Sequence, residues 1–285
     1  MMFGDRSGVP MARNFFAFPV NNWCTAGEFA YHRPMAVRGD LGSSTWGELQ
    51  NRLQRQLPGQ SLTLLVPVGS TEQHGRHLPL DTDTRIAQAL ARAVAGRLRR
   101  TASGRDEHAW SVAPAVAYGA SGEHQSFAGT ISIGTEVLSR VLLEYGRSAC
   151  CWAQRVVFVN GHGGNVPALA EAVGRLRFEA RDVAWLSCAT AAADAHAGHT
   201  ETSLLLYLSP DDVRFEQAQP GNSAPLAQLL PAMRRGGVAA VSAVGVLGDP
   251  TTATAAEGQR LFAEMLDSGV AAIHAWAPGP DGMLR

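Results

Sequence analysis

The sequence contains no lysine, because all 24 basic residues among its 285 are arginine. A P-loop needs a lysine, a pyridoxal-phosphate enzyme needs one for its Schiff base, and a lysine nucleophile is excluded too. The formal net charge of −1 lacks the basic excess that is typical of nucleic-acid-binding proteins. We therefore expect neither these enzyme classes nor a nucleic-acid partner.

Cysteines and long apolar runs are also scarce. The four cysteines show no C-x-x-C spacing and are too sparse for a disulfide scaffold. The apolar runs at 62–68 and 156–159 are far shorter than the roughly 18 residues that span a bilayer. The N-terminus has no apolar segment of the kind found in signal peptides. These absences predict a cytoplasmic protein with no membrane partner.

Hydrophobic residues make up 46% of the chain and charged residues 17%, which is enough for a large core. Residues 1–40 show no clear periodicity and are predicted to be an N-terminal extension without an assigned role. Residues 41–285 are expected to form a single catalytic domain. Within it, apolar runs of strand length alternate with segments of helical period; the strands are predicted at 62–68, 112–116, 155–159 and 183–187, and the helices at 83–98, 136–152 and 166–179.

This alternation predicts a three-layer α/β/α sandwich with a mostly parallel central sheet. In such folds ligands bind beyond the carboxyl ends of the strands. Two polar, glycine-rich segments, 69–77 and 160–165, directly follow apolar strands. The sequence therefore places a functional site at that edge of the sheet.

The segment 69–83 is the richest in groups that can bind a metal. Glu72 and His74 are two residues apart, so in extended backbone they point to the same side, and Asp83 begins the next helix. Carboxylates and imidazoles together suit Zn²⁺, Mn²⁺ or Fe²⁺. The alternative is that Asp83 only stabilises the helix start and that His77 is a solvated loop residue.

Two further segments contribute histidines. In 160–165, His162 lies among three glycines; a phosphate loop is less favoured there, because the G-x-G-x-x-G pattern and a lysine are both missing. In 196–203, Glu201 and Ser203 open an apolar helix, and helix capping alone would also explain them. Together the three segments predict one site at three strand ends.

In identity and spacing, these three segments resemble the signature segments of the creatininase family of amidohydrolases. The segments 118–130 and 233–257 and the ending at 280–283 resemble the branch of this family in the mycofactocin system. This resemblance implies a metal-dependent hydrolase of C–N bonds. Its substrate would be a ribosomally made precursor peptide, from whose C-terminus a modified Val-Tyr dipeptide is released. The alternatives are hydrolysis of a small cyclic amide or formamide, and a metal-binding partner protein without catalysis.

The resemblance also implies two divalent ions per subunit (Zn²⁺, Fe²⁺ or Mn²⁺) and a homo-oligomer of six or eight subunits. Glu72 and His162 would bind the first ion and His74 the second, and Asp83 would bridge both. The bridging water would attack an amide carbonyl.

In creatininase a glutamate stands two residues after the loop histidine, and this chain has Gly164 there. We expect Glu201 to supply the missing ligand. The resemblance implies that His196 is a catalytic residue and that His199 takes no part. We expect His196 to protonate the leaving nitrogen and Glu201 to be catalytic as well. The expected substrate-binding residues are His124, Ser126 and Gly163.

Overall fold

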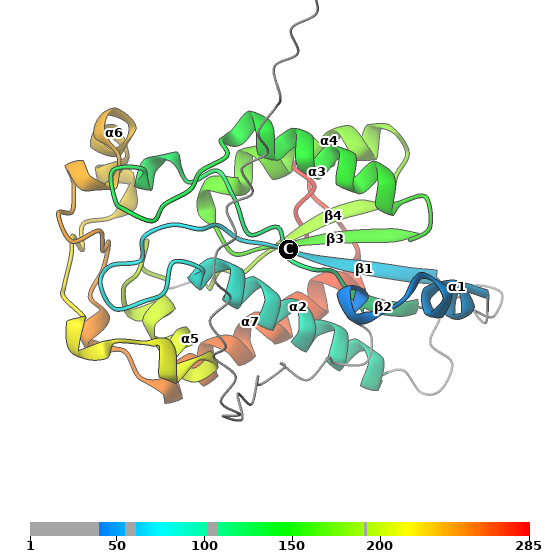
Figure 1. The fold of residues 1–285 in the computed structure, drawn as a ribbon, viewed down its shortest axis with the longest axis horizontal. Coiled ribbons are helices and arrows are strands. Elements are labelled where there is room, and N and C mark those ends of the chain that lie inside the picture. The colour runs from blue at the N-terminus through cyan, green and yellow to red at the C-terminus, as the bar shows by residue number, and fades with distance from the viewer. Residues whose placement is uncertain (1–39, 55–60, 102–107, 191–192) are drawn as a thin grey trace, which may run out of the picture. The chain divides into compact units, whose positions relative to one another are not determined.

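The computed structural model describes residues 40–54, 61–101, 108–190 and 193–285 (Figure 1). The predicted N-terminal extension lies outside the described residues except for its last position, and it stays a prediction. Among the helices of the described residues, none has the length and apolar character that crossing a membrane requires.

In the described part of the chain, four parallel strands form the central sheet, in the order β2-β1-β3-β4. The strands are β1 (Ser61–Val68), β2 (His108–Val112), β3 (Arg155–Asn160) and β4 (Val183–Ser187). The side chains of β1 are buried throughout, because helices cover both faces of the sheet. The predicted parallel sheet is confirmed. Three of the four predicted strands have nearly the same bounds as β1, β3 and β4.

The prediction of a strand at 112–116 was wrong, because β2 ends at Val112, the first residue of the predicted strand. Pro114 has no N–H to donate and interrupts the ladder with β1. The backbone stays beside β1 nevertheless. Ala113 N donates to Leu65 O, and Val116 N donates to Pro67 O, both at 2.9 Å.

Helices cover the two faces of the sheet (Figure 1). One face carries α2 (Thr82–Thr101), α5 (His199–Leu208) and α7 (Ala255–Ala275), and the other carries α3 (Thr135–Ala149) and α4 (Val166–Phe178). The described residues also include the helices α1 (Trp46–Gln54) and α6 (Leu226–Gly236). The predicted three-layer architecture is confirmed.

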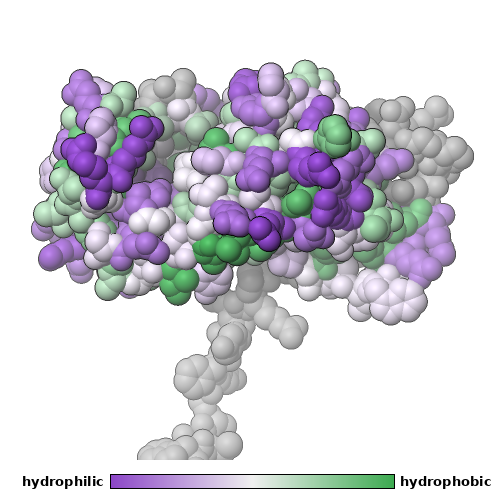
Figure 2. All heavy atoms as spheres, turned by 90° about the horizontal axis from the view of Figure 1, so that it is seen from above, coloured by the Kyte–Doolittle hydropathy of each residue, from purple (hydrophilic) through white to green (hydrophobic). Residues whose placement is uncertain are grey.

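The alternation of side chains along each strand divides the hydrophobic core in two. Leu65 and Val157 pack with the side chains of α2, α5 and α7. Leu64 and Val156 pack with those of α3 and α4. Figure 2 shows the face of the molecule on the α3 and α4 side, where hydrophilic residues predominate and hydrophobic patches lie between them.

Candidate metal centre

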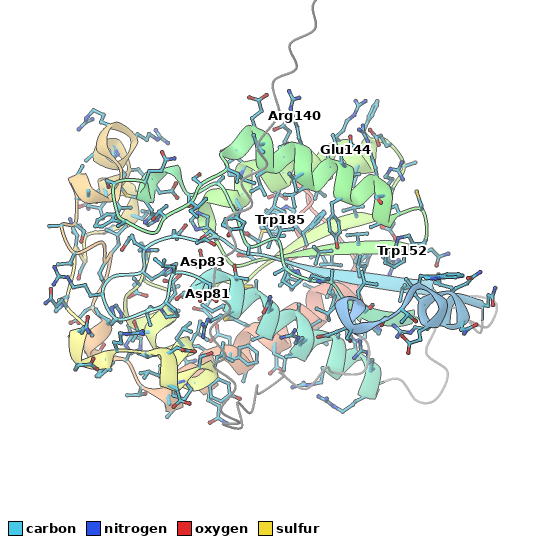
Figure 3. All side chains as sticks on the ribbon, viewed as in Figure 1. Asp81, Asp83, Arg140, Glu144, Trp152 and Trp185 are labelled. Atoms are coloured by element: carbon cyan, nitrogen blue, oxygen red, sulfur yellow. The ribbon has the colours of Figure 1, made fainter. Side chains whose placement is uncertain are left out.

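Polar loops that follow two neighbouring strands meet at one edge of the sheet. β1 leads into the loop that carries Glu72 and His74, and β3 leads into the loop that carries His162. Asp83 lies in the first turn of α2. Figure 3 shows Asp83 at this edge and Trp152, which precedes β3, at the opposite edge. The site is therefore at the carboxyl ends of the strands, as the sequence predicts.

Asp83 faces two histidines with its two carboxylate oxygens. Its Oδ1 lies 3.1 Å from His74 Nε2, and its Oδ2 lies 3.2 Å from His162 Nδ1. The Ser70 hydroxyl hydrogen-bonds Asp83 Oδ2 at 2.7 Å and Glu72 Oε2 at 2.8 Å, and so holds the two carboxylates together. We call Glu72, His74, Asp83 and His162 the central cluster.

Glu72 is fully buried, and one of its oxygens has no hydrogen bond. Its Oε2 lies 3.3 Å from His162 Nε2, whereas Oε1 makes no hydrogen bond among the described residues and lies 3.3 Å from His124 Nε2. Burial raises the pKa of Glu72 to about 8, although His162 opposes this shift. A buried carboxylate oxygen without a hydrogen bond is costly, so this position favours a bound cation.

The other three members of the central cluster are held as ion pairs. Burial would raise the pKa of Asp83, but His74 and His162 hold that pKa well below its usual value. Burial would lower the pKa of His74, but Asp83 outweighs it and raises the pKa to about 10. The pKa of His162 is raised against burial by Glu72 and Asp83. A histidine that binds a metal is neutral, so a bound ion would replace these protons.

Glu201 lies beside the central cluster, next to His74. Its Oε2 is 3.8 Å from His74 Nε2 and accepts a hydrogen bond from Ala197 N at 2.6 Å. Burial raises the pKa of Glu201 to about 7. Ala197 has a φ of 52°, an unfavourable conformation for a residue with a side chain, and the Glu201 carboxylate helps to hold it.

Among the residues that the structure describes, three sets of side chains have ligand atoms close enough to share a metal ion. The first set is Glu72, Asp83 and His162, the second is His74, His196 and Glu201, and the third is Glu72, His124 and His196. All the donors are carboxylate oxygens or imidazole nitrogens, which suit Zn²⁺, Mn²⁺ and Fe²⁺. The residues of the site therefore fit divalent metal ions. Asp83 has one oxygen toward each of the first two sets, as a bridging ligand would.

A hollow of about 310 Å³ opens onto these residues, and we call it the metal-centre hollow. Its polar side chains are Asp83, Glu123, His124, His162, His196 and Glu201, and its apolar side chains are Leu226, Leu230 and Met233 from α6 together with Leu247 and Ala195. Three glycines complete the lining. No arginine belongs to this lining among the described residues, and its basic side chains are the histidines.

Two glycines allow the loop after β3 to lie close to its neighbours. A Cβ at Gly161 would lie 2.3 Å from Asp83 O, so only glycine lets this loop approach the start of α2. A Cβ at Gly164 would lie 2.4 Å from Ala120 O and 2.5 Å from His162 Nε2. A side chain at Gly164 is therefore excluded, and a ligand in that region has to come from another segment.

The structure brings most of the predicted site residues together. These are Glu72, His74, Asp83, His124, His162, Gly163, His196 and Glu201. Their convergence agrees with the sequence prediction of one site, while their individual roles stay predictions.

Other polar residues from the same segments lie away from the central cluster. Ser126 is exposed and does not belong to the lining of the metal-centre hollow. His77 is buried, with Nε2 2.8 Å from Thr202 Oγ1, so the alternative of a solvated loop residue was wrong. His199 lies 2.8 Å from Thr252 Oγ1 through its Nδ1.

Three residues at the site were not predicted, namely Ser70, Gln73 and Glu123. Gln73 Nε2 lies 2.8 Å from His124 Nδ1, and Gln73 O accepts a hydrogen bond from His196 Nε2 at 2.8 Å. Ser70 and Gln73 flank the predicted ligands in sequence, which was the available signal. Glu123 lies in a loop far from them in sequence, and only its position next to His124 pointed to it.

Comparisons with known proteins find similar chains. A family model described as creatinine amidohydrolase matches residues 43–273. The mycofactocin precursor peptide peptidase of Mycobacterium ulcerans (strain Agy99) is 62% identical over 259 residues, covering 90% of this chain and 98% of that protein. A solved structure titled "Creatininase Mn" has a TM-score of 0.66 at 25% identity, and the match covers 84% of this chain and 98% of that one. A creatininase variant of the Zn-Zn type has a TM-score of 0.65 at 25% identity, with the same coverage.

Proposed function

The chain belongs to the creatininase family, and we propose from this premise that it is a metal-dependent peptidase. Its substrate would be the mycofactocin precursor peptide, cleaved near the C-terminus to release a modified Val-Tyr dipeptide. The relative from Mycobacterium ulcerans carries the name of that activity and is similar over nearly its whole length. We also propose two divalent ions per subunit and a homo-oligomer of six or eight subunits.

The main support for metal-dependent hydrolysis is the position of Asp83 between His74 and His162. One carboxylate with an imidazole at each oxygen is the arrangement that two neighbouring metal ions need from a bridging ligand. Glu72 adds a buried carboxylate on the His162 side. When bound, such a pair of ions lowers the pKa of a water molecule and polarises the carbonyl oxygen of the scissile bond.

His196 is suited to moving the proton that this reaction requires. Its Nε2 donates to the carbonyl oxygen of Gln73, so Nδ1 carries the free electron pair. Burial and the neighbouring His74 and His124 hold the pKa of His196 well below its usual value, so the ring is neutral. A neutral imidazole can accept a proton from water and deliver it to the leaving nitrogen, which cannot leave as an anion.

The lining of the metal-centre hollow supports a peptide substrate. Leu226, Leu230 and Met233 from α6 give the lining an apolar part. A valine or tyrosine side chain would bury apolar surface there, whereas creatinine is small and polar. The volume of about 310 Å³ lies within the range of ligand-binding pockets.

The test is an assay of the purified protein on the modified precursor peptide and, separately, on creatinine. We expect mass spectrometry to detect the released Val-Tyr dipeptide, and we expect a metal chelator to stop its release. Creatinine should remain unchanged over the same time. Production of creatine with no cleavage of the peptide would contradict the proposed function and favour the small-amide alternative.

A further inference from the structure

Glu123 places a fourth carboxylate at the metal centre. It lies in the short 3₁₀ helix η2 (Gly122–His124), in the loop between β2 and α3. Its Oε1 is 3.4 Å from His162 Nε2, and its side chain belongs to the lining of the metal-centre hollow. The side chain is 29% exposed, so most of it is buried.

The backbone on both sides of Glu123 is held in place. Before it, Ala120 N donates to Asn165 Oδ1 at 2.9 Å, which ties the loop to the segment after β3. After it, His124 N donates to Ser121 O at 3.0 Å. The carbonyl of Glu123 packs so closely on Gly237 that a Cβ there would lie 2.5 Å away. The position of the Glu123 backbone is therefore fixed by the fold.

Glu123 occupies the space beside Gly164. A Cβ at Gly164 would lie 2.8 Å from Glu123 Oε1, in addition to its contacts with Ala120 O and His162 Nε2. The carboxylate of one loop thus takes the volume that a side chain of the other loop would need. Of these two positions, only Glu123 can bring a ligand to His162.

The number of carboxylates at the site can be compared with the charge of two divalent cations. Four carboxylates meet there, those of Glu72, Asp83, Glu123 and Glu201. Among the described residues, the ion pair of Glu123 is with His162, which also faces Glu72 and Asp83. Two divalent cations would balance four carboxylates with the histidines neutral. Without Glu123 that balance would fall one negative charge short.

One ring nitrogen of His162 faces the carboxylates of both Glu72 and Glu123. His162 Nε2 is 3.3 Å from Glu72 Oε2 and 3.4 Å from Glu123 Oε1. Ligand atoms bound tetrahedrally to Zn²⁺ at about 2.0–2.1 Å are about 3.3–3.4 Å from one another. Resting on the proposed metal dependence, we propose that Glu123 is a ligand of the ion bound by Glu72, Asp83 and His162.

The test is the metal content of Glu123→Gln after loading with Zn²⁺ and dialysis against metal-free buffer. We expect two ions per chain in the wild type and one in the variant, whose affinity for the second ion falls by about 100-fold or more in a chelator competition. That loss exceeds the 10- to 100-fold range of residues that act through a ligand. The Co²⁺-loaded variant should also show a changed visible absorption spectrum.

Glu136→Gln is the matched control, because Glu136 lies exposed on α3 and pairs with Arg140. It should retain both ions. Glu123→Ala is the second variant, and far-UV circular dichroism should show that both Glu123 variants keep the wild-type fold.

A folded variant that keeps both ions, or whose affinity falls by less than about 100-fold, would overturn the inference and make Glu123 a residue that positions His162. Loss of both ions would also overturn it. These outcomes leave the proposed function intact. That function fails separately if the wild type binds no ion and cleaves the peptide in the presence of chelator.

Discussion

Replacing Asp83 by asparagine is expected to remove both metal ions and to abolish peptide cleavage. Asp83 has one oxygen toward His74 and the other toward His162, and a neutral amide can neither balance two cations nor offer them two equivalent oxygens. We expect kcat/KM to fall by more than the roughly 10³-fold that loss of a strong transition-state contact costs. Elemental analysis and a chromatographic assay of dipeptide release measure the two effects.

Asp81→Asn is the control for this variant. Asp81 lies two residues away, but its carboxylate accepts a hydrogen bond from Arg85 Nε at 2.7 Å and faces away from the central cluster. Its replacement should leave metal content and activity near the wild-type values. If the Asp83 variant keeps two ions per chain, or loses less than about 10-fold in kcat/KM, then Asp83 is no bridging ligand.

Replacing His196 by alanine is expected to lower kcat by about 10²- to 10⁴-fold, the contribution of general acid–base catalysis. Both metal ions should remain, because Glu72, His74, Asp83 and His162 are unchanged. KM should change little, since His196 is expected to act on the proton rather than on substrate affinity. Steady-state kinetics and metal analysis of the same preparation separate these effects.

His199→Ala is the matched control, because His199 lies three residues further along the chain and contacts Thr252 instead of the central cluster. It should retain most of the activity. A His196 variant that loses one ion would show that His196 is a ligand. A variant with unchanged kcat would show that another group transfers the proton.

The fold could be predicted where hydrophobic periodicity was strong. The runs that became β1, β3 and β4 are continuous and apolar, so their burial was evident from the sequence. α6 was missed, and it contains Pro231, which normally ends a helix. α7 was missed although Thr254 caps it by accepting a hydrogen bond from Glu257 N, a pattern that the sequence displays.

The site could be predicted where its residues follow strand ends. Glu72, His74 and His162 lie directly after β1 and β3, so the parallel sheet brings them together. Glu123 could not be assigned in this way, because its approach to His162 depends on how the loop after β2 packs against Gly164. That contact is tertiary and leaves no periodic signal. Ser126 lies in the same loop and is exposed instead.

The most direct test of a paired metal centre is the ratio of metal to protein in the wild-type chain. The protein would be purified without chelator, loaded with Mn²⁺ or Zn²⁺ and freed of unbound ions by gel filtration. Convergence of Glu72, His74 and His162 on Asp83 predicts two ions per chain. A ratio of one, or no retained metal, would contradict it.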